Sequence, residues 1–133
     1  MTQVTRSVTL NAAPGEVWAL IGGFQTLPDW HPAVETSTRE DIGGSEHRRL
    51  GLAGGGEILE KNLGGDTMSV GYEIIESPLP VADYKATISI ADAGGKAVVV
   101  WASTFEGTAD GAADIIAGIY TAGLDALAAK FGT

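Results

Sequence analysis

The chain of 133 residues contains no cysteine, which excludes a disulfide-bonded scaffold, thiol catalysis and cysteine-ligated zinc or iron–sulfur clusters. Basic residues are also few: eight Lys plus Arg stand against 17 Asp plus Glu, so the formal net charge is −9. Such an acidic surface repels phosphate groups, and we expect neither nucleic acid nor an anionic membrane as a partner. The sequence shows no signal-peptide pattern at its start and no apolar run near the roughly 18 residues of a membrane span. We therefore expect a cytoplasmic protein without membrane insertion.

Glycine, by contrast, is abundant, and its positions divide the chain into short segments. Eleven of the 19 glycines lie in clusters that separate stretches of strand length, at 22–23, 43–44, 54–56, 64–65 and 94–95. The hydrophobic share of 44% is enough for a packed core. Since the length is typical of one domain, we predict a single domain over residues 1–133.

The first half of the pattern predicts a strand and then two short helices. Val4, Val8 and Leu10 alternate with polar residues, as in a half-buried strand. Pro14 suits the first turn of a helix that ends at Gly22–Gly23, and a short second helix or turn is expected over 24–27. Six strands with short connections follow, which favours an antiparallel meander; we expect them at 34–41, 46–52, 57–63, 68–76, 83–91 and 96–105.

The last segment predicts a long helix. Apolar residues recur at helical spacing from Ile116 to Phe131, and Asp110 is expected to cap a helix that starts near Gly111. The predicted fold class is therefore α+β, with a curved seven-stranded antiparallel sheet that wraps a long C-terminal helix.

Arg48 is the most informative charged residue. Strand periodicity places it on the apolar face with Leu50 and Leu52, whereas His47 is expected on the solvent face. A guanidinium that faces a core needs a carboxylate or a ligand anion as its partner. The alternatives are a misassigned strand face and an arginine that reaches the rim of the sheet.

The strand over 57–63 leaves two carboxylates to choose between. Leu59 and Leu63 share the parity of Glu57 and Lys61, so counting leucines places Glu60 outside. A bulge near Gly56 would reverse this assignment, because one extra residue flips every later side chain. The residues alone leave Glu60 undecided.

Several other side chains are candidates for lining a pocket. His31 lies in a proline-flanked loop, and no histidine spacing of a metal motif occurs, so no metal site is expected. The glycines at 54–56 lack the lysine of a phosphate loop and are predicted to form a hairpin turn. Aromatic residues either line a ligand pocket or simply fill the core; they are Trp30, Tyr72, Tyr84, Trp101 and Tyr120.

Six short motifs, in this order and spacing, carry a family resemblance over almost the whole chain. They are Ala13-Pro-Gly-Glu-Val-Trp18, Leu27-Pro-Asp-Trp-His-Pro32, His47-Arg-Arg-Leu50, Gly56-Glu-Ile-Leu-Glu-Lys-Asn-Leu63, Tyr84-Lys-Ala-Thr87 and Val100-Trp-Ala-Ser-Thr-Phe105. Together they resemble the polyketide cyclase/dehydratase branch of the START-like, birch-pollen-allergen-like superfamily. The resemblance implies the helix-grip fold, with two short helices between the first two strands and a hydrophobic cavity between the sheet and the last helix.

Within this superfamily the chain is similar to the plant lachrymatory-factor synthases. The arginine, glutamate and tyrosine of their cavity match Arg48, Glu60 and Tyr84, so the resemblance favours Glu60 over Glu57 as the inward carboxylate. Trp-His-Pro at 30–32 replaces a Trp-Trp-Pro-like run, which implies a more polar cavity mouth.

The implied function is a cofactor-independent enzyme that acts on a small, largely apolar organic molecule by cyclisation, dehydration or isomerisation. In this hypothesis Glu60 transfers a proton, Arg48 holds an oxyanion or keeps Glu60 ionised, and Tyr84 donates a hydrogen bond to developing negative charge. The alternative is that Arg48 and Glu60 neutralise one another in a purely structural pair. The alternative functions are a non-catalytic carrier of hydrophobic metabolites and a partner-regulating module. A monomer or a homodimer is expected.

Overall fold

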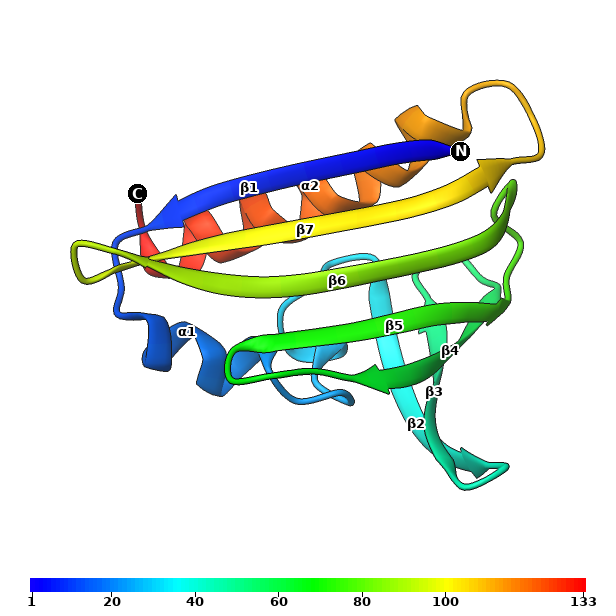
Figure 1. Cartoon of the computed structure of the whole chain (residues 1–133), viewed down its shortest axis with the longest axis horizontal. Coiled ribbons are helices and arrows are strands. Elements are labelled where there is room, and N and C mark those ends of the chain that lie inside the picture. The colour runs from blue at the N-terminus through cyan, green and yellow to red at the C-terminus, as the bar shows by residue number, and fades with distance from the viewer.

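The computed structural model describes all 133 residues as a curved antiparallel sheet with a long helix against it (Figure 1). The chain begins with strand β1, the helix α1 and a single 3-10 turn, η1. Six consecutive strands follow, and the helix α2 ends the chain. The bounds are β1 Thr2–Leu10, α1 Pro14–Ile21, η1 Leu27–Asp29, β2 Val34–Ile42, β3 Ser45–Leu52, β4 Glu57–Gly64, β5 Ser69–Glu76, β6 Val81–Ala93, β7 Lys96–Gly107 and α2 Ala112–Phe131.

The sheet order is β1-β7-β6-β5-β4-β3-β2, so β2 to β7 form the predicted meander and β1 pairs with the last strand. Short glycine turns close the hairpins; Gly54, Gly55 and Gly56 all have positive φ, which glycine adopts without a steric penalty. Figure 1 shows that β2 and β3 run across the direction of β1 and β7, so the sheet curves strongly. This curvature encloses space beside α2.

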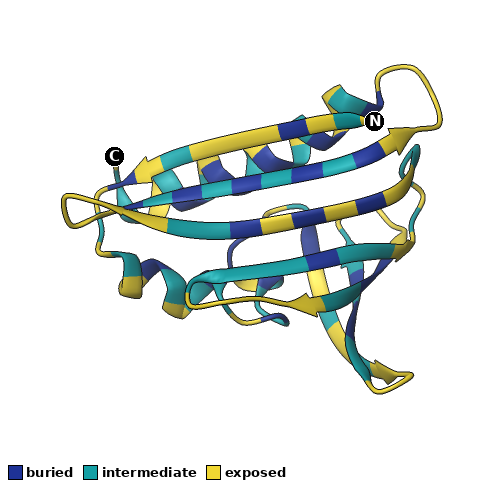
Figure 2. Ribbon diagram, viewed as in Figure 1, coloured by how far each residue is buried: buried dark blue, intermediate teal, exposed yellow.

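The core lies between the concave face of the sheet and α2. Strand β7 alternates strictly, and its inward residues Val99, Trp101, Ser103 and Phe105 are buried, as the banding in Figure 2 shows. By length and composition α2 is apolar enough to cross a membrane, yet five of its six buried residues belong to the core cluster of this domain. The predicted helix-grip architecture is confirmed.

One local prediction is wrong. Residue Gly111, with φ of 83°, occupies the N-cap position of α2, and no side chain caps the helix; Asp110 therefore stands one residue too early to cap it. The short helix or turn expected over 24–27 is present as a turn at residues 24–25, followed by the 3-10 turn that begins at Leu27.

The faces of β3 and β4 correct two further predictions. His47 lies on the face opposite to Arg48, as expected, but it is buried between its cross-strand neighbours Glu40 and Lys61. Leu59 also lies on this outer face and is nevertheless buried, paired with Arg49. Counting leucines therefore assigned β4 the wrong way round.

Candidate functional site

A cavity of about 160 Å³ lies between the concave face of the sheet and α2. Fifteen of its 17 lining residues are hydrophobic, and Glu60 carries the only carboxyl group among them. Ala53, in the β3–β4 hairpin, is the exposed member of the lining. The half-buried members are Ala33, Leu52, Ile74, Leu79 and Ile119.

Arg48 and Glu60 form a buried ion pair behind the cavity wall. They are direct cross-strand partners in β3 and β4, so both side chains point to the concave face. Arg48 Nε donates a hydrogen bond of 2.7 Å to Glu60 Oε1, and each side chain is only 7% exposed. Glu60 lines the cavity, whereas Arg48 does not. Arg48 therefore acts on the cavity through Glu60.

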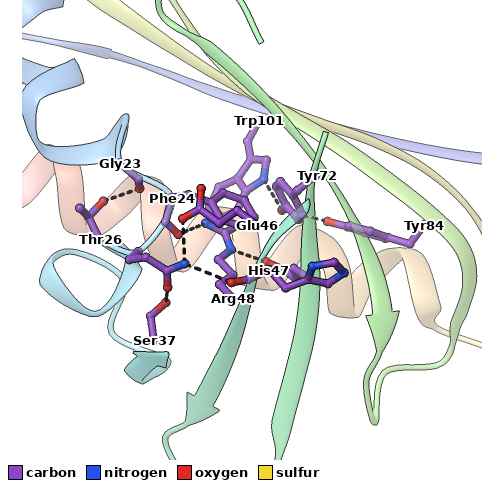
Figure 3. Close-up of polar contacts among 12 residues, drawn as sticks. Gly23, Phe24, Thr26, Ser37, Glu46, His47, Arg48, Tyr72, Tyr84 and Trp101 are labelled. Carbon is purple, nitrogen blue, oxygen red and sulfur yellow. Dashed lines mark hydrogen bonds and ion pairs between the residues drawn. The ribbon is translucent and has the colours of Figure 1, made fainter. Parts of the chain in front are cut away.

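The guanidinium of Arg48 is held on its other sides by Phe24 and Tyr72. Arg48 Nη1 donates to the Phe24 carbonyl oxygen at 3.0 Å, and the guanidinium carbon lies 4.2 Å from the Phe24 ring centroid and 4.8 Å from that of Tyr72. Gln25 fixes this loop by donating to Glu46 Oε2 and to the His47 carbonyl oxygen. Figure 3 shows Phe24, Glu46 and His47 around Arg48. The sequence pattern gave no signal for Phe24, because it lies in an irregular loop.

Burial raises the pKa of Glu60, and the charge and hydrogen bond of Arg48 oppose this shift without cancelling it. Desolvation thus outweighs the ion pair. A carboxyl whose pKa is moved toward neutrality is suited to accept and return a proton.

Three tyrosines and one tryptophan form a hydrogen-bonded cluster on the cavity wall. Trp101 Nε1 donates to the Tyr72 hydroxyl at 2.9 Å, the Tyr72 and Tyr84 hydroxyls lie 3.3 Å apart, and Tyr84 is bonded to Tyr120. Burial raises the pKa of Tyr72 and Tyr84 and raises that of Tyr120 to about 12, so all three hydroxyls keep their protons at neutral pH. The buried Ser103 hydroxyl adjoins Tyr120 and has no hydrogen-bond partner.

A bulge aims Tyr84 at the cavity. Asp83 has φ of 53°, and the register of β6 against β7 shifts between Ala82 and Lys85. Bulges of this kind redirect a side chain, and here Tyr84 stacks against Phe105 with ring centroids 5.8 Å apart.

His31 joins the loop before β2 to α2. Its Nδ1 accepts a 3.1 Å hydrogen bond from the Ala33 N–H, so Nε2 carries the proton and donates to the Ile119 carbonyl oxygen at 2.8 Å. Burial lowers the pKa of His31, against the opposing effect of that carbonyl. Since both ring nitrogens are bonded to backbone, His31 presents only carbon atoms to the cavity.

The structure thus brings together six of the eight predicted site residues on the cavity lining: Glu60, Tyr84, His31, Tyr72, Trp101 and Tyr120. Arg48 stands behind Glu60, and Trp30 packs on the rings of His31 and Trp101 outside the lining. Ser103 was missed, because a serine on an alternating strand carries no distinguishing pattern. No group of three or more His, Asp or Glu side chains is placed to hold a metal ion.

An internal cavity enclosed by a curved antiparallel sheet and a C-terminal helix defines a helix-grip, ligand-binding fold. The family described as polyketide cyclase / dehydrase and lipid transport matches residues 1–132, and the chain belongs to this family. No functionally curated protein matches it.

Solved structures agree with this assignment. The chain is 32% identical to the protein XoxI from Bacillus cereus, with a TM-score of 0.90 over 98% of this chain and 96% of that one. It shares its fold with the Zhui aromatase/cyclase from Streptomyces sp. R1128, at 16% identity and a TM-score of 0.71 over 97% and 92% of the two chains. A START superfamily protein from Mycobacterium smegmatis has a TM-score of 0.70 at 14% identity, over 96% and 92%.

Proposed function

We propose that the protein binds a small apolar organic molecule in this cavity and transfers a proton on it through Glu60, without a cofactor. The observation that carries the proposal is one buried carboxyl of raised pKa on a wall with no other charged side chain. Oε1 of Glu60 is bonded to Arg48, which leaves Oε2 for a molecule in the cavity. Such chemistry includes isomerisation, dehydration and cyclisation.

Arg48 and the tyrosines have separate roles in this proposal. Arg48 is a positioning residue, because it fixes the orientation and charge state of Glu60 without lining the cavity. Tyr84, bonded to Tyr72 and Tyr120, donates a hydrogen bond to negative charge that develops on the substrate. The aromatase/cyclase with the same fold supports catalysis as a use of such a cavity.

Isotope exchange tests proton transfer without knowledge of the natural substrate. Cyclohexanone is incubated with the protein in D₂O, and loss of its α-proton signals is followed by NMR. We expect wild type and Glu57→Gln to accelerate exchange. The exchange rate with Glu60→Gln should be at least about tenfold lower than with wild type. Glu57 is the matched control, since it is an exposed carboxylate on the same strand. Full exchange by Glu60→Gln would overturn the proposal.

A non-catalytic carrier is the second candidate, favoured by the closed Arg48–Glu60 pair, which neutralises both charges within the protein. Binding of the ketone by wild type without any accelerated exchange would support the carrier.

A further inference from the structure

The size and the polarity of the cavity together restrict what it can hold. Its volume is about 160 Å³, close to the roughly 150 Å³ at which an apolar protein cavity accepts one benzene molecule. A second fused ring exceeds that space, so it would either displace wall residues such as Ile58 and Leu50, which are buried in the core cluster, or lie outside the cavity past the exposed Ala53.

The hydroxyl cluster has one more proton than its internal bonds can use. Tyr72, Tyr84 and Tyr120 carry three hydroxyl protons, and two hydroxyl–hydroxyl bonds link them. Trp101 can only donate, so its bond to Tyr72 takes up an acceptor and none of these protons. Ser103 does not change the balance, because its hydroxyl makes no hydrogen bond and therefore takes up none of these protons. One O–H donor is therefore left over among groups that line the cavity.

The charges on the wall disfavour an anionic ligand, and a cationic ligand gains little there because Arg48 already neutralises Glu60. Arg48 is already paired with Glu60 and does not line the cavity, so no free cation faces a bound anion. A ligand carboxylate would lie near Glu60 and lose its hydration with no opposite charge as compensation. The arrangement therefore favours a neutral ligand that offers an oxygen acceptor.

We infer that the cavity takes a neutral carbonyl compound of about one six-membered ring, with its carbonyl oxygen on the tyrosine cluster and a neighbouring C–H at Glu60. This inference rests on the proposed function for the role of Glu60 and adds the class of substrate. Glu60 Oε2 takes the proton from the carbon next to the carbonyl. The C–H electron pair becomes the carbon–carbon double bond of an enolate, whose oxygen accepts the surplus O–H of the cluster. Return of a proton from Glu60 to a different atom completes an isomerisation with no further reactant.

Binding of three compounds to the wild-type protein tests the proposed class of substrate directly. Binding is measured by calorimetry or ligand-detected NMR for cyclohexanone, for the two-ring 1-decalone and for cyclohexanecarboxylate. We expect the two-ring ketone to bind at least about tenfold more weakly than cyclohexanone, because overpacking a cavity is destabilising. The carboxylate should bind about a hundredfold more weakly or not at all. Equal or tighter binding of either compound would overturn the inference.

A pair of variants at neighbouring positions tests whether this cavity limits the size of the ligand. Ile58 lines it, whereas Leu59 is equally buried on the outer face of the same strand. Ile58→Ala should bring the affinity for 1-decalone to within about threefold of that for cyclohexanone, and Leu59→Ala should leave the wild-type ratio unchanged. An unchanged ratio in folded Ile58→Ala would contradict the assignment.

The position of the carbonyl oxygen is read from the infrared band of bound cyclohexanone. If a tyrosine hydroxyl donates a hydrogen bond to the carbonyl oxygen, the C=O stretching band of bound cyclohexanone should lie at lower frequency than in hexane. A band at the hexane frequency would overturn the placement of the carbonyl oxygen on the tyrosine cluster. Failure of proton transfer is distinguishable, because it would leave the order of affinities intact while wild type catalyses no isotope exchange.

Discussion

Arg48 and Glu60 face each other across β3 and β4 as a pair that is bonded at 2.7 Å and almost sealed from solvent, and only Glu60 reaches the cavity. A buried pair of this kind is costly to desolvate, so its presence is weak evidence for stability in itself. It places one carboxyl, with one oxygen still available, on a wall that has no other charged side chain. The proposed function rests on this difference between Glu60, which lines the cavity, and Arg48, which does not.

Removal of one partner should be strongly destabilising. Glu60→Gln leaves the Arg48 charge buried and uncompensated, so we expect a loss of about 3 kcal/mol in the free energy of unfolding, measured by urea denaturation at pH 7. Glu57→Gln, the exposed control, should change it little. A loss no larger than that of the control would contradict the buried pair.

Replacement of both partners should recover that loss. Arg48→Met with Glu60→Leu removes both charges and keeps apolar volume, so its unfolding free energy should return to within about 1 kcal/mol of wild type. This double variant also lacks the carboxyl in a folded protein, and it should be inactive in isotope exchange. Activity in this variant would exclude Glu60 as the base.

The titration of Glu60 is a third prediction. Because burial raises the pKa of Glu60 in the folded state, ionisation of Glu60 disfavours folding. The stability that the protonated carboxyl contributes is therefore complete below the unfolded pKa of 4.5, and it is lost as the pH rises through the folded pKa. Carbon-13 NMR of labelled glutamate should show one carboxyl with a midpoint above 4.5 that disappears in Glu60→Gln. A Glu60 midpoint at or below 4.5 would refute the argument.

His31 predicts an acid-sensitive contribution to stability. Its folded pKa is lowered by burial, so stability is complete above the unfolded pKa of 6.5 and is lost as pH falls through the folded pKa. Between pH 7.5 and 5.5 the unfolding free energy of wild type should therefore fall more steeply than that of His31→Gln. Parallel curves would show that His31 is not held neutral by its contacts.

Two glycines of α2 provide a matched test of helix packing. A Cβ at Gly123 would lie 2.7 Å from His31 Cδ2 and 3.0 Å from Trp101 Cζ3, whereas Gly118 has open space. Gly123→Ala should destabilise the protein by about 1–3 kcal/mol, and Gly118→Ala should stabilise it by roughly 1 kcal/mol. Thermal unfolding of both variants checks this prediction. Equal changes in stability would contradict the close packing of α2 against His31 and Trp101 at Gly123.

Much of the architecture follows from local patterning. Period-two alternation and glycine turns locate seven strands to within two or three residues, because each hairpin is closed by its own turn chemistry. The helix ends are less predictable, as Asp110 shows, since the cap depends on the backbone conformation of the next residue, Gly111.

The side chains of the site were harder to predict from local patterning than the strands. Leu59 is apolar, buried and on the outer face, so hydrophobicity alone misassigned Glu60, and only the family resemblance favoured it. The bulge at Asp83 that aims Tyr84, and the Phe24 carbonyl that holds Arg48, depend on tertiary contacts with no local signal.

The pH dependence of cyclohexanone isotope exchange tests the central claim most directly. If Glu60 is the base, the rate with wild type should rise as Glu60 loses its proton, with a midpoint above 4.5 that matches its NMR titration. Glu57→Gln should keep this profile, and Glu60→Gln should fall to the rate of buffer alone. An unaltered profile in Glu60→Gln would contradict the account.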